Sequence, residues 1–142
     1  MRTRIIVLIL ATAMMAMGCQ QKKEVAQAEE KEVTNRVVGV EEFEKLIADT
    51  SQVVILDVRT DKEILEEEGL EGALHIDVGQ DHFRDKCKRM LPKGKTVAVY
   101  CRNGFRSHTA GKLLNEVGFD AVDLRGGLVA WKEKHGTTAN NR

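Results

Sequence analysis

Proline and aromatic residues are scarce in this chain of 142 residues, which holds one proline, one tryptophan, one tyrosine and four phenylalanines. That scarcity excludes collagen-like and mucin-like chains, as well as surfaces that stack nucleobases on aromatic rings. Three cysteines are too few for a small domain held together by disulfides. Acidic and basic residues number 22 each, so no net charge attracts nucleic acid and we expect no such partner. The length suits one folded domain of ordinary size.

A mostly apolar run without charge lies near the amino-terminal end, from Ile5 to Gly18, and two arginines precede it. This pattern is typical of a secretory signal and is too short to span a bilayer comfortably. Cys19 follows directly after the small residue Gly18, which resembles the cleavage motif of bacterial lipoproteins, although Ala16 stands where that motif prefers leucine. We expect residues 1–18 to be a lipoprotein signal peptide and Cys19 to carry the lipid. An ordinary signal peptide followed by an incidental cysteine is the alternative.

Polar sequence follows the cysteine and contains no aromatic residue before the first apolar patterns. Such a stretch cannot bury enough surface to order itself. We therefore expect residues 19–35 to be the lipidated cysteine and a flexible tether, residues 36–136 to fold, and residues 137–142 to be a disordered tail.

Apolar residues of the expected domain alternate between short continuous runs and helix-spaced faces. The continuous runs predict strands over residues 53–58, 73–76, 96–100 and 121–124. The helix-spaced positions predict helices beginning near Glu41, over 83–90, over 110–117 with Gly118 just past the end, and around Trp131. Thr60 and Glu63 fit the capping box of a further short helix. This alternation predicts an α/β fold with a central parallel sheet of about five strands and helices on both faces.

One segment, from Tyr100 to Ser107, places a cysteine and two arginines between a predicted strand and a predicted helix. Ligands bind beyond the carboxyl ends of the strands in such sheets. Cys101 would lie at a helix N-terminus, where unpaired N–H groups favour an anion, and Arg102 and Arg106 add positive charge. These features stabilise the thiolate, which is the nucleophilic form of cysteine. Gly104 lets the backbone turn so that amides point inward.

Three motifs in order, over roughly residues 37–135, resemble those of single-domain rhodaneses. Residues 101–107 read C-R-N-G-F-R-S, which is similar to the active-site loop C-R-x-G-x-R-S of that family. L-D-V-R at 56–59 with Glu63 after it resembles the first signature, and L-R-G-G at 124–127 through Trp131 resembles the closing one. The resemblance implies a rhodanese-like fold and a sulfurtransferase. In that family the cysteine takes a sulfane sulfur from a donor such as thiosulfate and passes it to a thiol or cyanide.

The same resemblance assigns roles to residues of the loop. Cys101 is the expected nucleophile, and Arg106 is the expected ligand of the donor's oxyanion because its planar fork suits such a group. Arg102 is a second candidate for that binding. The remaining substrate-binding candidates are Asn103, Gly104 and Phe105. No cofactor and no metal are expected, and a thioredoxin-like protein is a candidate partner.

Residues outside the loop receive supporting or structural roles. Asp57 and Arg59 are expected to support the loop rather than contact the substrate.

Cys87 shares a helix face with other apolar residues and is expected to pack in the core, with a role as resolving thiol as the alternative. His108 is expected to face solvent, with tuning of the reactive cysteine as the alternative. Gly126 and Gly127 are expected to allow a close approach of backbone to the loop.

The chain departs from the family pattern before its third strand. The family usually reads G-H-I-x-G-A there, whereas residues 68–73 read E-G-L-E-G-A. The Gly-His pair is therefore missing, and Ile64 stands where an aromatic residue is common. We expect the backbone of residues 64–71 to differ from the pattern, without a direct effect on the chemistry.

Two other functions fit the same architecture. Phosphatases and arsenate reductases have a C-x5-R loop that is wide enough for a tetrahedral phosphate, whereas Cys101 and Arg106 are separated by four residues. The shorter loop suits a single sulfur atom. A non-catalytic rhodanese module for binding or sulfur sensing is the other alternative, and the presence of Cys101, Gly104 and Arg106 argues against it.

The amino-terminal pattern predicts a protein of the bacterial cell envelope, anchored by lipid, with its domain in the periplasm. A labelled fatty acid fed to cells that express the full chain should become attached to the protein, and Cys19→Ala should abolish the label. The variant should also be released in soluble form, because several acyl chains on one cysteine hold a protein firmly at a membrane. Equal labelling of both proteins would contradict lipidation at Cys19.

Overall fold

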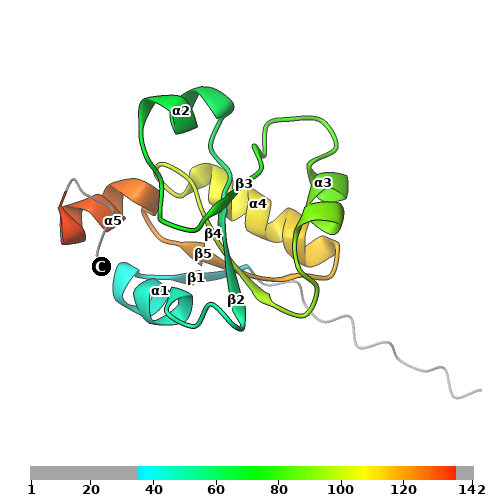
Figure 1. Cartoon of the computed structure of the whole chain (residues 1–142), viewed down its shortest axis with the longest axis horizontal. Coiled ribbons are helices and arrows are strands. Elements are labelled where there is room, and N and C mark those ends of the chain that lie inside the picture. Colours follow the sequence, from blue (N-terminus) through cyan, green and yellow to red (C-terminus); the bar gives the residue numbers. More distant parts are fainter. Residues whose placement is uncertain (1–34, 137–142) are drawn as a thin grey trace, which may run out of the picture. The chain divides into compact units, whose positions relative to one another are not determined.

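A computed structural model of the protein describes residues 35–136 (Figure 1). The expected signal peptide, the expected lipidation site Cys19, the tether up to residue 34 and the tail 137–142 lie outside the described residues. The strands are β1 (Arg36–Val38), β2 (Val53–Asp57), β3 (Leu74–His75), β4 (Thr96–Tyr100) and β5 (Asp120–Leu124). The helices are α1 (Val40–Ile47), α2 (Asp61–Glu66), α3 (Phe83–Met90), α4 (Phe105–Glu116) and α5 (Gly127–His135).

The strands form one parallel sheet in the order β1-β5-β4-β2-β3. This arrangement confirms the predicted α/β class and the parallel sheet. β2 and β4 are central and mostly buried, as their continuous apolar runs predict. β1 is the strand that the sequence pattern did not predict, because three residues are too few to show a periodicity.

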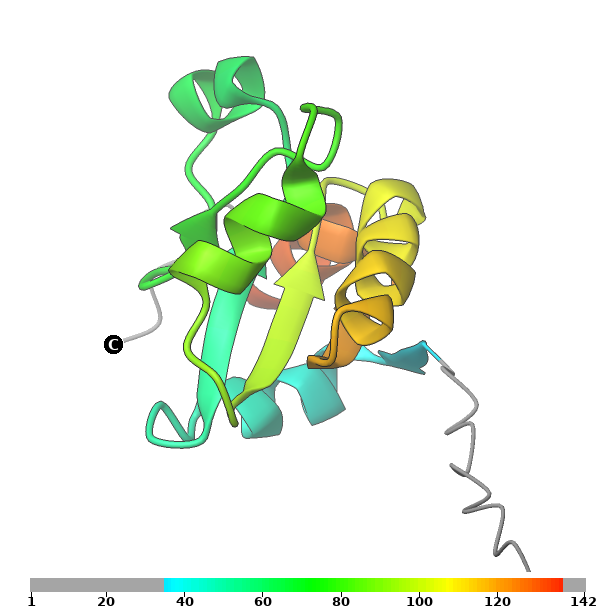
Figure 2. The same cartoon turned by 90° about the vertical axis from the view of Figure 1, so that its right-hand side faces the viewer.

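Helices cover both faces of the sheet. Phe83 and Cys87 of α3 join Leu114 of α4 in one buried apolar cluster, whereas Phe43 of α1 and Trp131 of α5 lie in the other. Figure 2 shows α3 and α4 on the near side of the sheet and α5 behind it. The rings of Phe43 and Trp131 meet edge to face with centroids 6.4 Å apart, so the buried tryptophan packs α5 against α1 on this face.

The short helix α2 follows directly from the capping box. The Thr60 hydroxyl accepts the amide of Glu63 at 3.3 Å, and the Glu63 carboxylate accepts the amide of Thr60 at 3.0 Å. None of the residues of α2 is fully buried. The helix lies beyond the carboxyl ends of the strands rather than on a face of the sheet (Figure 2).

The segment after α2 is where the chain departs from the rhodanese pattern, and Gly69 falls at the place of the missing histidine. The space beside Gly69 is filled by the hydroxyl of Tyr100, which donates to Asp57 at 2.6 Å and accepts the amide of Leu70 at 2.9 Å. A Cβ at Gly69 would overlap that hydroxyl and lie 2.7 Å from the Asp57 carboxylate. The glycine is therefore required by close packing at this position.

This packing predicts that adding a methyl group at Gly69 lowers the stability of the fold. Gly69→Ala should lower the free energy of unfolding by about 1–3 kcal/mol, because the methyl group displaces the tyrosine hydroxyl from a buried polar cluster. Urea unfolding of the variant and the parent measures the difference. Gly39→Ala is the matched control, since a Cβ there would have no neighbour within 4 Å. A loss as large in the control would mean that the effect does not come from packing beside Tyr100.

Candidate active site

The candidate site lies at the carboxyl end of β4, where residues 101–104 connect this strand to α4. The carboxyl ends of β2 and β5 flank the loop, because both strands pair directly with β4. The topology therefore brings together the three segments with rhodanese-like motifs. Asp57 and Arg59 come from the end of β2, and Gly126 and Gly127 come from the end of β5.

Cys101 is fully buried, with its sulfur inside the loop. The amide of Gly104 points at Sγ over 3.1 Å, and the side-chain oxygen of Asn103 lies 3.9 Å from it. Gly104 has φ of 95°, a left-handed conformation that turns its amide inward at the beginning of α4. An N–H aimed at the sulfur stabilises a thiolate or a persulfide anion in this place.

The outer side of the loop is held by the first turn of α5. The amide of Leu128 donates to the carbonyl of Cys101 at 2.8 Å, and the amide of Val129 donates to the carbonyl of Arg102 at 3.0 Å. A Cβ at Gly127 would overlap the carbonyl of Cys101, and the glycine also has φ of 59°. The expected close approach of the glycine pair is thus a direct contact between α5 and the loop.

Arg106 is the residue whose surroundings differ most from the expectation. Its two terminal nitrogens donate to the two oxygens of Glu63, each over 2.6 Å, so α4 is joined to α2 by a bidentate ion pair. The sequence marked Glu63 as a capping residue and gave no sign of this second partner. The guanidinium expected to bind a donor oxyanion is already paired with a carboxylate.

Asp57 and Arg59 form a buried ion pair beneath the loop. Arg59 Nε donates to the Asp57 carboxylate at 2.9 Å, and the Arg59 side chain is entirely enclosed. The Tyr100 hydroxyl donates to the same carboxylate, and Tyr100 immediately precedes the cysteine. The pair therefore fixes the strand end from which the loop starts, and the supporting role of these residues stays a prediction.

Other sequence candidates take different positions. Arg102 and Asn103 are exposed on the loop, and the Phe105 side chain is 81% exposed at the beginning of α4. Cys87 is enclosed in the core, and burial raises the pKa of its thiol to about 12, so it stays protonated and unreactive. Between residues 35 and 136, no cluster of three or more His, Cys, Asp or Glu side chains could hold a metal ion.

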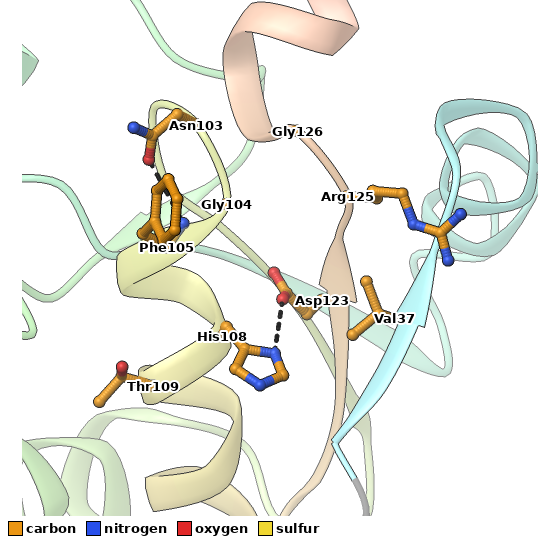
Figure 3. Close-up of a pocket in the computed structure, with 9 residues that line it drawn as sticks. All are labelled: Val37, Asn103, Gly104, Phe105, His108, Thr109, Asp123, Arg125 and Gly126. Carbon is orange, nitrogen blue, oxygen red and sulfur yellow. Dashed lines mark hydrogen bonds and ion pairs between the residues drawn. The ribbon is translucent and has the colours of Figure 1, made fainter.

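A pocket of about 440 Å³ lies on the other side of the loop, between α4 and the β1–β5 edge (Figure 3). Asp123 lines it and is almost fully buried, and this burial raises the pKa of the carboxyl group. His108 Nδ1 lies 3.6 Å from this carboxylate, so its half-exposed ring, expected to face solvent, also has a buried acidic neighbour. The loop residues Asn103, Gly104 and Phe105 line this pocket, whereas Cys101 and Arg106 do not.

Comparison with known proteins agrees with this architecture. The family model described as the rhodanese-like domain matches residues 39–134. A protein of Allochromatium vinosum named sulfurtransferase is 35% identical over 100 residues, which cover 70% of this chain and 89% of that protein. The crystal structure of a rhodanese-like domain protein from Staphylococcus aureus superposes with a TM-score of 0.54 at 27% identity, covering 68% of this chain and 90% of that one.

The match to the family model spans more than half of the chain and includes all three motifs around the loop. The chain therefore belongs to the rhodanese-like domain family. None of the helices between residues 35 and 136 combines the length and apolarity that crossing a membrane requires.

The Glu63–Arg106 pair predicts a specific acid dependence of stability. Hydrogen bonds from Arg106 lower the pKa of Glu63 from 4.5 to about 2, against an opposing effect of burial. A lowered folded-state pKa contributes stability above pH 4.5 that is lost as the pH falls towards 2. Glu63→Gln should therefore cost on the order of 2 kcal/mol at pH 7, and this difference should shrink steadily below pH 4.5.

Urea unfolding at several pH values between 3 and 7 measures the difference between the parent and Glu63→Gln. Glu66→Gln is the matched control on the same helix, because Glu66 is exposed and pairs only at 3.7 Å with Lys62. Exposed pairs of this kind contribute about 0–1 kcal/mol. A difference between parent and Glu63→Gln that stays constant with pH would show that the carboxylate does not stabilise the fold through its charge.

Proposed function

We propose that the protein is a rhodanese-type sulfurtransferase that carries a sulfane sulfur on Cys101 as a persulfide. The observation that carries this proposal is the sulfur of Cys101 inside a six-residue loop, with the Gly104 amide aimed at it over 3.1 Å. Membership of the rhodanese-like family and a relative named sulfurtransferase support the same reaction. The sulfur comes from a donor such as thiosulfate and goes to a thiol or to cyanide.

The reaction has two displacement steps. In the first, the Cys101 thiolate attacks the outer sulfur of thiosulfate; a new S–S bond forms, the old S–S bond breaks, and sulfite leaves with the electron pair. In the second, an acceptor thiolate or cyanide attacks the outer sulfur of the persulfide and the Cys101 thiolate is released. The inward amide of Gly104 stabilises the negative sulfur in both states.

Loop size supports this reaction over phosphoryl transfer. A persulfide adds one heavy atom to Cys101, whereas a phosphate needs room for four oxygens and donors placed around them. The loop from Cys101 to Arg106 is one residue shorter than C-x5-R. Its closing arginine also donates both terminal nitrogens to Glu63, so this guanidinium does not stand free to bind a phosphate.

We propose further that the domain is held at the bacterial envelope by lipid on Cys19 and acts in the periplasm. The uncharged run before Gly18 and the polar sequence after Cys19 support this location. A thioredoxin-like protein with a reactive thiol is the proposed protein acceptor, because it would approach the exposed side chains of Asn103 and Phe105 on the loop.

Intact mass measures the proposed intermediate directly. The protein should gain about 32 Da, the mass of one sulfur atom, after incubation with a sulfane-sulfur donor, and lose it on adding cyanide or excess thiol. Cys101→Ser should gain nothing. Cys87→Ser should still gain the sulfur, because Cys87 is a protonated core thiol. Hydrolysis of aryl phosphates that depends on Cys101, without any gain in mass, would overturn the proposal in favour of a phosphatase.

A further inference from the structure

Arg106 is the last residue of the six-residue loop, and its guanidinium is paired with the carboxylate of Glu63. Arg106 uses both terminal nitrogens on Glu63, and the fork of one group matches the two oxygens of the other. This is the geometry with which an arginine would otherwise bind a sulfonate. A donor oxyanion therefore competes with Glu63 for the same face of the guanidinium.

The carboxylate of Glu63 is held in position by hydrogen bonds from Thr60. Its Oε2 also accepts the Thr60 amide at 3.0 Å and the Thr60 hydroxyl at 2.9 Å, both from the capping box of α2. Releasing Arg106 would leave this carboxylate, which is only about one-fifth exposed, without its cation. Separating a partly buried pair in this way is costly, because one charge is left uncompensated.

The local charge consequently disfavours an anionic donor. Hydrogen bonds from Arg106 keep the pKa of Glu63 at about 2, so Glu63 is ionised at neutral pH. Asp77 is a further acidic group close enough to act electrostatically on Arg106, as does Cys101 itself. Thiosulfate brings two negative charges and a sulfonate that needs a donor such as Arg106, whereas the reacting end of an organic persulfide carries at most one negative charge and has no oxyanion to bind.

We infer that Glu63 selects the sulfur donor, so that the site takes its sulfur from a persulfide or polysulfide of an organic thiol in preference to thiosulfate. This inference rests on the proposed sulfurtransferase function and names its donor class. The Cys101 thiolate attacks the terminal sulfur of R–S–SH, a new S–S bond forms, and the old S–S bond breaks. The thiolate R–S⁻ leaves with the electron pair and takes up the proton, so R–SH is released and Cys101 carries the persulfide anion.

The test compares two donors on the full-length chain, purified in mild detergent. With cyanide as the sulfur acceptor in both assays, kcat/KM is measured with thiosulfate, from the release of sulfite, and with glutathione persulfide, from the release of glutathione. The parent protein should have the larger kcat/KM with glutathione persulfide. A kcat/KM with thiosulfate that is equal or larger would overturn the inference even if no variant folds.

Glu63→Gln keeps the shape of the side chain and removes its charge. The ratio of the thiosulfate kcat/KM to the persulfide kcat/KM should rise about tenfold in this variant, which is the size expected for one nearby charge in a partly solvated site. The double variant Glu63→Gln/Arg106→Gln should lose the gain, because the freed guanidinium is what binds the sulfonate. Glu66→Gln, on the same helix but paired only with Lys62, should leave the ratio unchanged.

Each result has one interpretation. If Glu63→Gln leaves the ratio unchanged, or lowers both rates in proportion, Glu63 holds the loop in position and does not select the donor. A gain that persists in the double variant would overturn the role given to Arg106. Absence of a Cys101 persulfide with either donor would instead contradict the proposed function itself, so the two failures are distinguishable by intact mass.

Discussion

The buried ion pair between Asp57 and Arg59 is the interaction on which the arrangement of the site depends. Arg59 is fully enclosed, and removing the Asp57 carboxylate would leave its buried guanidinium with only the longer 3.5 Å contact to Glu67. The same carboxylate accepts the hydroxyl of Tyr100, which reaches the amide of Leu70. Two central strands and the segment after α2 are thereby fixed to one another directly below the cysteine.

Polarity in the loop is divided between its two sides. The Gly104 amide points at the sulfur, whereas the carbonyls of Cys101 and Arg102 point outward to amides of α5. This orientation keeps these acceptor oxygens away from a sulfur that becomes negative in the proposed reaction. The arginine that closes the loop is neutralised by a neighbouring helix, so the interior owes its preference for anions to backbone dipoles more than to side-chain charge.

The sequence predicted most of the fold because its signals are local. The apolar run of β4, the capping box at Thr60 and the left-handed Gly118 each act within a few neighbouring residues. β1 was missed because it is three residues long and exists through its pairing with β5. The Glu63–Arg106 pair joins residues 43 positions apart, and Glu63 already had a sufficient local role, so no pattern indicated the second one.

The contact between α5 and the loop also bears on the order in which the protein is made. The carbonyls of Cys101 and Arg102 obtain their hydrogen-bond donors from Leu128 and Val129, which are synthesised more than twenty residues later. β1, made first, likewise waits for β5 before it has a neighbouring strand. A growing chain therefore contains Cys101 well before it contains the groups that shape its surroundings. The hydrogen bonds that hold the loop around Cys101 are therefore complete only when α5 has folded against it.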